Sequence, residues 1–173
     1  MENNNTPNDM YMYIGGRQSS ILGNYIPRYR YTGENRGTVT ATPTPIPLIS
    51  YRTKAGFDNR SLKLDSFSIA NNSTTNSVAI SVRLGGTLTG ASWQTPSNYL
   101  AEETALESDV SATAISGGYN VYAGTIAGPS RSSTTVFDEI NLSIPNGTLI
   151  TLCASGIGGN AAVDSGFRIR EEW

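Results

Sequence analysis

Four carboxylates that lie close together along this sequence are its best candidates for chemistry: Glu102, Glu103, Glu107 and Asp109. Paired carboxylates serve as acid and base in glycoside hydrolysis, and clustered carboxylate oxygens bind calcium. The cluster lacks the regular acidic spacing of a calcium-binding loop, and adjacent glutamates on a strand or helix point to different sides. We therefore favour a solvated loop edge. A salt-bridge patch opposite N-terminal arginines of another subunit, a metal site and a catalytic site are the alternatives.

The absence of histidine from the sequence narrows the chemistry further. Histidine is the commonest general base, the usual partner of a serine or cysteine nucleophile and a frequent zinc ligand. The only lysines, Lys54 and Lys63, do not follow a glycine-rich phosphate loop. The doublets Gly85-Gly86, Gly117-Gly118 and Gly158-Gly159 instead predict turns that need positive φ angles. We expect no enzyme activity, no cofactor and no metal.

Aromatic side chains offer a second kind of site. Trp93 and Tyr99 flank Pro96 in what we expect to be a long loop, where they could stack on a sugar. They could equally seal one end of the domain or contact another subunit, which is the interpretation we favour. Trp173 follows the last expected strand and is a candidate subunit contact.

The composition favours strands and turns over helices. Only 15% of the residues are charged, and the chain holds 18 glycines and 8 prolines among many serines, threonines and asparagines. Serine, threonine and asparagine side chains disfavour helices because they form hydrogen bonds with the nearby backbone, and glycine disfavours them because it loses more backbone entropy when it is ordered. A net charge of −2 gives no overall attraction to nucleic acid or anionic membranes. We therefore expect neither as a partner.

Targeting and cysteine signals are few. The N-terminus lacks the basic start and apolar centre of a signal peptide, so we expect synthesis and assembly in the cytoplasm. The sequence also has no apolar stretch long enough to span a membrane. Its single cysteine, Cys153, lies in an apolar run and is expected to be a buried thiol.

Residues 1–47 show no strand-like alternation, and we predict an extended N-terminal arm that ends in a proline-rich connector at 38–47. Residues 10–31 carry more aromatic and apolar side chains than a solvated linker would. Tyrosine and arginine anchor protein interfaces, and interleaved they can also stack on single-stranded nucleic acid. The small number of positive charges favours a protein partner. The candidate contacts are Tyr11, Tyr13, Arg17, Tyr25, Arg28, Tyr29, Arg30 and Tyr31.

Residues 48–173 alternate apolar and polar side chains in short segments separated by turn residues. The expected strands are 48–52, 60–70, 77–84, 108–115, 120–126, 136–144, 149–154 and 166–171, with a short one at Leu88. The alternation slips near Asp65, which predicts a β-bulge or a sheet corner. The fold class predicted is all-β: a jelly-roll-like antiparallel β-sandwich with an extended N-terminal arm. A barrel or an immunoglobulin-like sandwich is the competing architecture.

Several of these segments resemble virion structural proteins of tailed bacteriophages. The resemblance covers about residues 48–173 and consists of strand and turn segments: Leu48–Lys54, Leu62–Ile69, Val82–Leu84, Thr87–Trp93, Ser111–Gly118 and Arg168–Trp173. It implies a β-sandwich that assembles as a trimer on the particle, as capsid decoration (cement) proteins and fibre head domains do.

The sequence thus leads to a capsid decoration protein as the first hypothesis. The protein would form homotrimers on the capsid surface of the virion, contact the major capsid protein through its arm and stabilise the head. The alternative is a receptor- or glycan-binding head domain of a tail or head fibre that uses Trp93 and Tyr99. A carboxylate-based glycosidase is the least favoured hypothesis.

Overall fold

The computed structural model describes residues 29–57, 60–97, 99–101, 103–128, 133–137 and 142–172. These residues form β-strands and loops and contain no helix, so none that could cross a membrane. The strands are β1 (Tyr29–Ala41), β2 (Ile46–Thr53), β3 (Ser61–Asn71), β4 (Ser77–Leu84), β5 (Thr87–Thr89), β6 (Leu106–Asp109), β7 (Ala114–Ser116), β8 (Tyr119–Ile126), β9 (Ser133–Phe137), β10 (Ser143–Ile144), β11 (Ile150–Ile157) and β12 (Ala161–Glu172).

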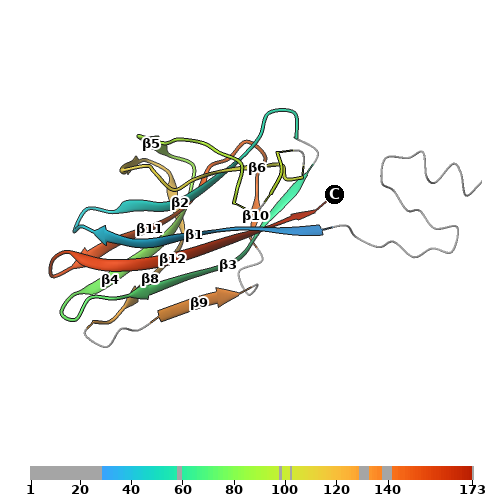
Figure 1. Ribbon diagram of the computed structural model, residues 1–173. Helices are drawn as coiled ribbons and strands as arrows, with labels where there is room; N and C mark the ends of the chain where they lie inside the picture. Colours follow the sequence, from blue (N-terminus) through green and yellow to red (C-terminus); the bar gives the residue numbers. More distant parts are fainter. Residues whose placement is uncertain are drawn as a thin grey trace, which may run out of the picture.

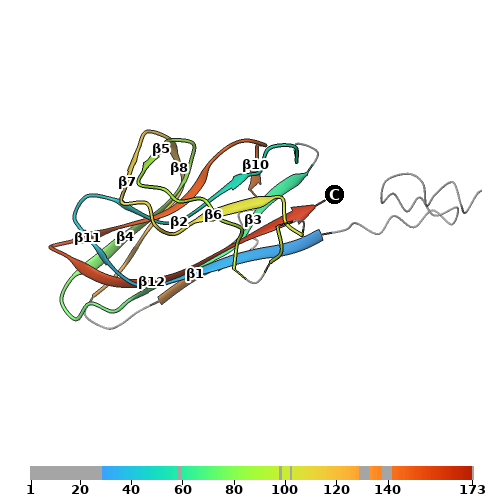
Figure 2. The ribbon, with the colours of Figure 1, turned by 45° about the horizontal axis from the view of Figure 1, so that its top comes forward.

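Two antiparallel sheets pack against each other (Figures 1 and 2). The first sheet has the order β1-β12-β3-β10, with β9 also paired to β3, and the second has the order β6-β2-β11-β4-β8. Four pairs of strands are nested along the chain: β4 with β8, β3 with β9, β2 with β11, and β1 with β12. Nested pairs divided between two sheets make a jelly roll, so the predicted fold is confirmed.

The core lies between the sheets and is built from alternate side chains of both. Its largest fully buried members include Phe67, Phe167 and Tyr51. The Tyr51 hydroxyl donates a 2.7 Å hydrogen bond to the carbonyl oxygen of Phe167, so this phenol joins the second sheet to the first. Burial and the nearby Glu34 carboxylate raise the Tyr51 pKa, which keeps the hydroxyl protonated as a donor.

A long excursion, residues 85–118, connects β4 to β8. It starts and ends at two glycine doublets that face each other, beyond which β5 and β7 continue as a paired ribbon. Gly86 has a φ of 96° and Gly118 a φ of 73°. A Cβ on Gly118 would lie 2.8 Å from the carbonyl oxygen of Gly85, so both conformation and space require glycine there. Between the doublets, β6 pairs with β2 at the opposite edge of the second sheet.

The N-terminal arm is shorter than the sequence predicted. Residues 29–41 form β1 and pair with β12 along almost its whole length, and 46–47 belong to β2. Thr32 and Glu34 of β1 are buried inside this chain's own sandwich. The predicted division at 47/48 and the connector without sheet structure at 38–47 are therefore wrong, and the domain begins by Tyr29. Residues 1–28 lie outside the described part of the chain.

Two local predictions in the sandwich hold. The strand expected at 77–84 is β4 with the same bounds. The slip near Asp65 is a β-bulge, because Arg168 pairs with Ser66 and the next residue, Ile169, pairs with Leu64, which leaves Asp65 as the extra residue.

Candidate functional site: the hollow beside β1

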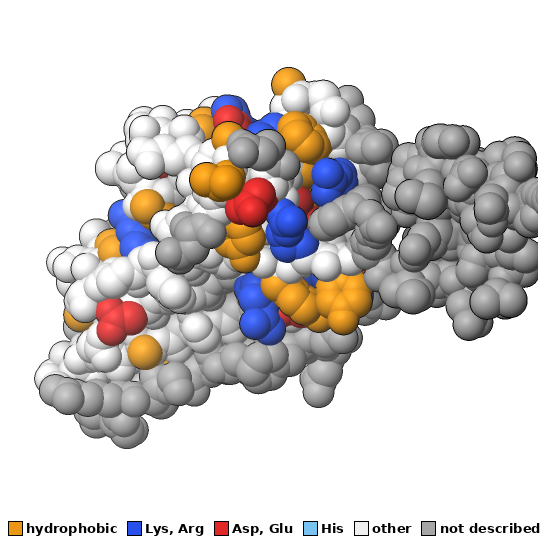
Figure 3. Space-filling model, turned by 45° about the vertical axis from the view of Figure 1, so that its right-hand side comes forward, with side chains coloured by type: hydrophobic (Ala, Val, Ile, Leu, Met, Phe, Trp, Pro, Cys, Tyr) orange, Lys and Arg blue, Asp and Glu red, His pale blue; other side chains and the backbone are white. Residues whose placement is uncertain are grey.

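Among the described side chains of the first sheet, the most exposed aromatic ones lie on the outer surface of β1. Alternate residues face outward, and Tyr29 and Tyr31 are 56% and 38% exposed, respectively. Their rings pack edge to face with centroids 5.5 Å apart. Figure 3, turned toward the end of the sandwich where β1 starts, shows hydrophobic side chains interspersed with basic and acidic ones. Such a mixture is typical of a binding surface.

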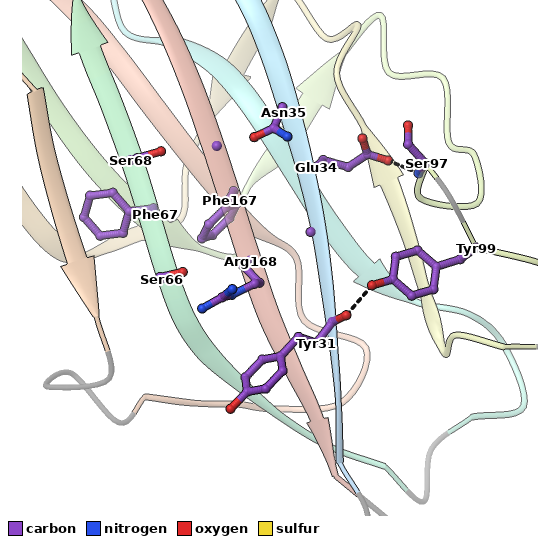
Figure 4. A pocket seen from close by; sticks show the side chains of 12 residues that line it. Tyr31, Glu34, Asn35, Ser66, Phe67, Ser68, Ser97, Tyr99, Phe167 and Arg168 are labelled. Carbon is purple, nitrogen blue, oxygen red and sulfur yellow. Dashed lines mark hydrogen bonds between the residues drawn. The ribbon is translucent and has the colours of Figure 1, made fainter.

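An open hollow of about 570 Å³ lies on this outer face, across β1, β12 and β3 (Figure 4). Asn35 of β1 and Ser68 of β3 both pair with Gly166 of β12, and their side chains converge above it. A Cβ on Gly166 would lie 2.8 Å from Asn35 Oδ1 and 3.0 Å from Ser68 Oγ. The lack of a side chain at Gly166 therefore brings two polar groups from different strands together over the floor of the hollow.

Arg168 borders the hollow and is held from two sides. Its Nε donates to the Asp65 carboxylate, and its guanidinium lies over the Tyr31 ring, 5.0 Å from the centroid. Asp65 is 8% exposed, whereas the Arg168 side chain is 47% exposed. The bulge in β3 thus serves to place a carboxylate beside Arg168, which fixes the guanidinium against Tyr31.

The excursion closes the other side of the hollow by contacting the free edge of β1. The Tyr99 hydroxyl donates to the Tyr31 carbonyl oxygen, and the Ser97 amide donates to the Glu34 carboxylate. The same Glu34 oxygen accepts a 3.1 Å hydrogen bond from Ser108 Oγ of β6. These bonds cover an edge that would otherwise be open to strand addition.

A second buried carboxylate, Glu171, fixes the excursion to β12. It is fully buried and accepts hydrogen bonds from the Thr104 hydroxyl at 2.6 Å, from the Ala105 amide at 2.8 Å and from the Thr32 hydroxyl. Lys54 Nζ donates a 3.1 Å hydrogen bond to the carbonyl oxygen of Thr104. A buried carboxylate with this many donors has a structural role.

The acidic cluster predicted from the sequence does not converge. Glu103 accepts a 2.9 Å hydrogen bond from the Leu100 amide, and Glu107 forms a 2.8 Å ion pair with Arg52. Glu102 lies outside the described residues. Among the residues that the structure describes, no three acidic or cysteine side chains are grouped to hold a metal ion. The solvated edge fits Glu103 and Glu107, whereas Asp109 is buried.

Asp109 holds the excursion together from its buried position at the end of β6. Its carboxylate accepts hydrogen bonds from the Ser92 amide at 2.7 Å, the Ser111 hydroxyl at 2.6 Å and the Ala112 amide at 3.0 Å. Burial acts to raise the Asp109 pKa, but these donors outweigh it, and the net effect lowers the pKa. The charged form is thus the one that the fold stabilises.

The predicted aromatic pair Trp93 and Tyr99 does not share a partner. Arg52 lies 4.3 Å above the Trp93 ring, beside its ion pair with Glu107, whereas Tyr99 contacts Tyr31 at the hollow. Of the predicted arm contacts, Tyr29, Arg30 and Tyr31 belong to β1 of this chain, so they are not part of a separate arm. The other predicted contacts lie outside the described residues: Tyr11, Tyr13, Arg17, Tyr25, Arg28 and Trp173.

Sequence reasoning missed Asn35, Ser68 and Arg168, which meet only through the pairing of three strands. The one local signal was the slip in alternation at Asp65, which marked the bulge but not its ion pair. Asp164 is a similar case: it joins Thr38 and Asn72, each at 2.6 Å, and these hydrogen bonds lower its pKa.

The comparisons with known proteins gave no family model, no curated protein and no solved structure that matches this chain. The functional argument therefore rests on the residues and the fold.

Proposed function

We propose that this protein is a virion structural protein of a tailed bacteriophage and decorates the outside of the capsid. In this proposal it forms homotrimers, and residues 1–28 contact the major capsid protein or a neighbouring trimer. Multiple weak contacts from each trimer together hold it on the shell and reinforce the shell. Assembly takes place in the host cytoplasm, and the mature location is the capsid surface.

The observation that carries the proposal is that the described residues already form both sheets of the sandwich, while the segment before them is rich in aromatic and aliphatic side chains. Residues 29–172 contain both sheets of a jelly roll, so the segment before Tyr29 is not needed to complete either sheet. That segment holds Tyr11, Tyr13, Tyr25 and several aliphatic side chains, and it enters the domain beside the exposed rings of Tyr29 and Tyr31. Apolar and aromatic surface of this kind is stabilised when a partner covers it.

The roles of the described carboxylates also support a structural function. Glu34, Glu171 and Asp109 connect the excursion to the sheets, and Glu107 pairs with Arg52. Viral capsid domains are among the proteins built on jelly rolls, although the fold alone assigns no function.

Removing residues 1–28 tests the proposal. Particles that lack this protein are incubated with purified full-length protein or with the 29–173 fragment, and bound protein is measured after sedimentation. We expect both forms to be trimers, the full-length form to bind at saturable occupancy and the fragment to bind at least about tenfold more weakly, because the multivalent contacts are lost. Equal occupancy by the two forms would refute the role of the segment.

A further inference from the structure

We infer that the hollow on the outer face of β1, β12 and β3 is a binding site for a neutral saccharide. Its volume of about 570 Å³ is within the usual range of small-ligand sites. This inference adds a binding activity to the protein and does not depend on capsid decoration. It rests on the polar groups, the floor and the charge balance of the hollow.

Two polar side chains in the hollow are available to form hydrogen bonds with a ligand. In the described part of the chain, the side chains of Asn35 and Ser68 make no hydrogen bond to another residue, although they converge above Gly166. An amide group supplies two donors and an acceptor, and a hydroxyl group supplies one donor and accepts as well. Together they match the adjacent hydroxyl groups of a sugar ring, each of which both donates and accepts.

Gly33 leaves the floor of the hollow open, although neither the packing around it nor its backbone conformation requires a glycine. A Cβ at this position would meet its nearest atom, on the Arg168 side chain, at 3.5 Å, an ordinary contact. Its φ angle is also outside the positive range that demands glycine. A glycine inside a strand is unfavourable relative to alanine, and such glycines often mark the close approach of a ligand or of another backbone.

The charges around the hollow favour a neutral ligand. Arg168 is paired with Asp65, and Glu34 is held by Ser108 and Ser97. Among the described residues that line the hollow, Arg168 is the one cation and is already paired, and the Glu34 carboxylate is only 8% exposed, so neither charge is presented to an ionic ligand. The ring of Tyr99 and the edge of Tyr31 border the hollow and offer apolar surface to the carbon–hydrogen faces of a sugar.

An N-terminal segment from another copy of the chain fits the hollow less well. The floor is formed by the backbone of Gly33 and Gly166 together with Asn35, Ser66 and Ser68, so the aromatic residues of such a segment would meet apolar surface only at the Tyr31 and Tyr99 borders. A strand from another copy could not pair freely with the edge of β1 at Tyr31, because the Tyr99 hydroxyl already donates to the Tyr31 carbonyl oxygen.

The test uses the full-length protein and an immobilised panel of neutral oligosaccharides built from glucose, galactose, mannose and N-acetylglucosamine. The strongest binder is then titrated against wild type, Asn35→Ala, Ser68→Ala and Gly33→Gln, with Thr125→Ala on the exposed part of β8 as control. Loss of one ligand hydrogen bond in Asn35→Ala or Ser68→Ala should weaken binding about threefold to tenfold. Gly33→Gln fills the hollow and should abolish measurable binding, while Thr125→Ala should bind like wild type.

Thermal unfolding of each variant separates loss of the site from loss of the fold. Gly33→Gln should unfold no earlier than wild type, because a Cβ makes only ordinary contacts there, the rest of the side chain can extend into the open hollow, and glycine is unfavourable in a strand. The inference is overturned if wild type binds no member of the panel, or if Gly33→Gln binds as well as wild type. It is also overturned by the following result with a synthetic peptide of residues 10–28. The peptide binds wild type, no saccharide competes with it, and Gly33→Gln loses the peptide binding.

Discussion

Thr104 Oγ1 lies 2.6 Å from the carboxylate of Glu171, and this hydrogen bond joins the middle of the long excursion to the last strand of the jelly roll. Thr32 of β1 donates to the same carboxylate oxygen. One buried side chain therefore fixes the first strand, the last strand and the excursion relative to one another. All three of these elements contribute residues to the lining of the hollow, so its shape depends on this connection.

Replacing Glu171 by alanine should lower the free energy of unfolding by about 2–4 kcal/mol, because the hydroxyl groups of Thr32 and Thr104 and the Ala105 amide would lose a buried acceptor. Urea titration followed by tryptophan fluorescence measures the change. Glu107→Ala is the matched control, since its ion pair with Arg52 is partly exposed and should contribute less than about 1 kcal/mol. Similar losses in the two variants would contradict the structural role of Glu171.

Two glycines at positive φ allow the effects of conformation and space to be separated: Gly118 belongs to one of the facing doublets, and Gly147 is a single glycine in the turn after β10. Gly118→Ala and Gly147→Ala both place a side chain at a positive φ, of 73° and 72°, which costs about 1–2 kcal/mol. Only at Gly118 would the new Cβ also approach a backbone oxygen, at 2.8 Å, whereas it meets nothing within 4 Å at Gly147. Thermal unfolding should show Gly118→Ala as clearly the less stable variant. Equal melting temperatures would mean that the two doublets are not in contact.

Asp109 should make the protein sensitive to acid. Its pKa is lower in the folded protein than the value of about 3.9 expected in the unfolded chain, so the unfolded chain binds the proton more strongly. The stabilisation is complete above about pH 5 and is lost as the pH falls through 3.9 and the lower folded-state pKa. Urea titrations between pH 2 and 7 should show a shallower acid loss for Asp109→Asn, together with lower stability at pH 7. An unchanged acid slope would argue against a charged Asp109.

Cys153 should react slowly with thiol reagents in the native protein. It is fully buried, and burial raises the pKa of its thiol to about 11, with Arg83 and Ser81 acting in the opposite direction. A rise of about two pKa units leaves roughly 100-fold less thiolate at pH 8, and burial slows access further. Labelling with a chromogenic disulfide at pH 8 should therefore be at least about 100-fold faster in denaturant than in buffer. Rapid native labelling would place Cys153 at the surface.

The strands that could be predicted from the sequence are those whose inward side chains are apolar. β4 has Val78, Ile80, Val82 and Leu84 on one face, and its bounds were predicted without error. β1 was missed because the residues it buries at its start are Thr32 and Glu34. Their burial is possible only because the excursion and β12 supply hydrogen-bond partners, and those partners lie far away in the sequence.

The candidate site was harder to predict than the fold. Trp93 and Tyr99 were expected to act together because they are neighbours in the sequence, yet each turns to a different strand. Asn35, Ser68 and Arg168 have no local pattern in common, and only the register of β1, β12 and β3 brings them to one surface. Strand register of this kind depends on the whole sheet.

Whether this chain lies on a virus particle, and where, tests the central claim most directly. Single-particle cryo-electron microscopy of the virion, at a resolution that shows domain shapes, would locate it. The account predicts three copies of the jelly roll around each threefold site on the outer capsid surface, with density for residues 1–28 running onto the major capsid protein. A capsid surface without the jelly roll, or the domain found only at the tip of a tail or head fibre, would contradict it.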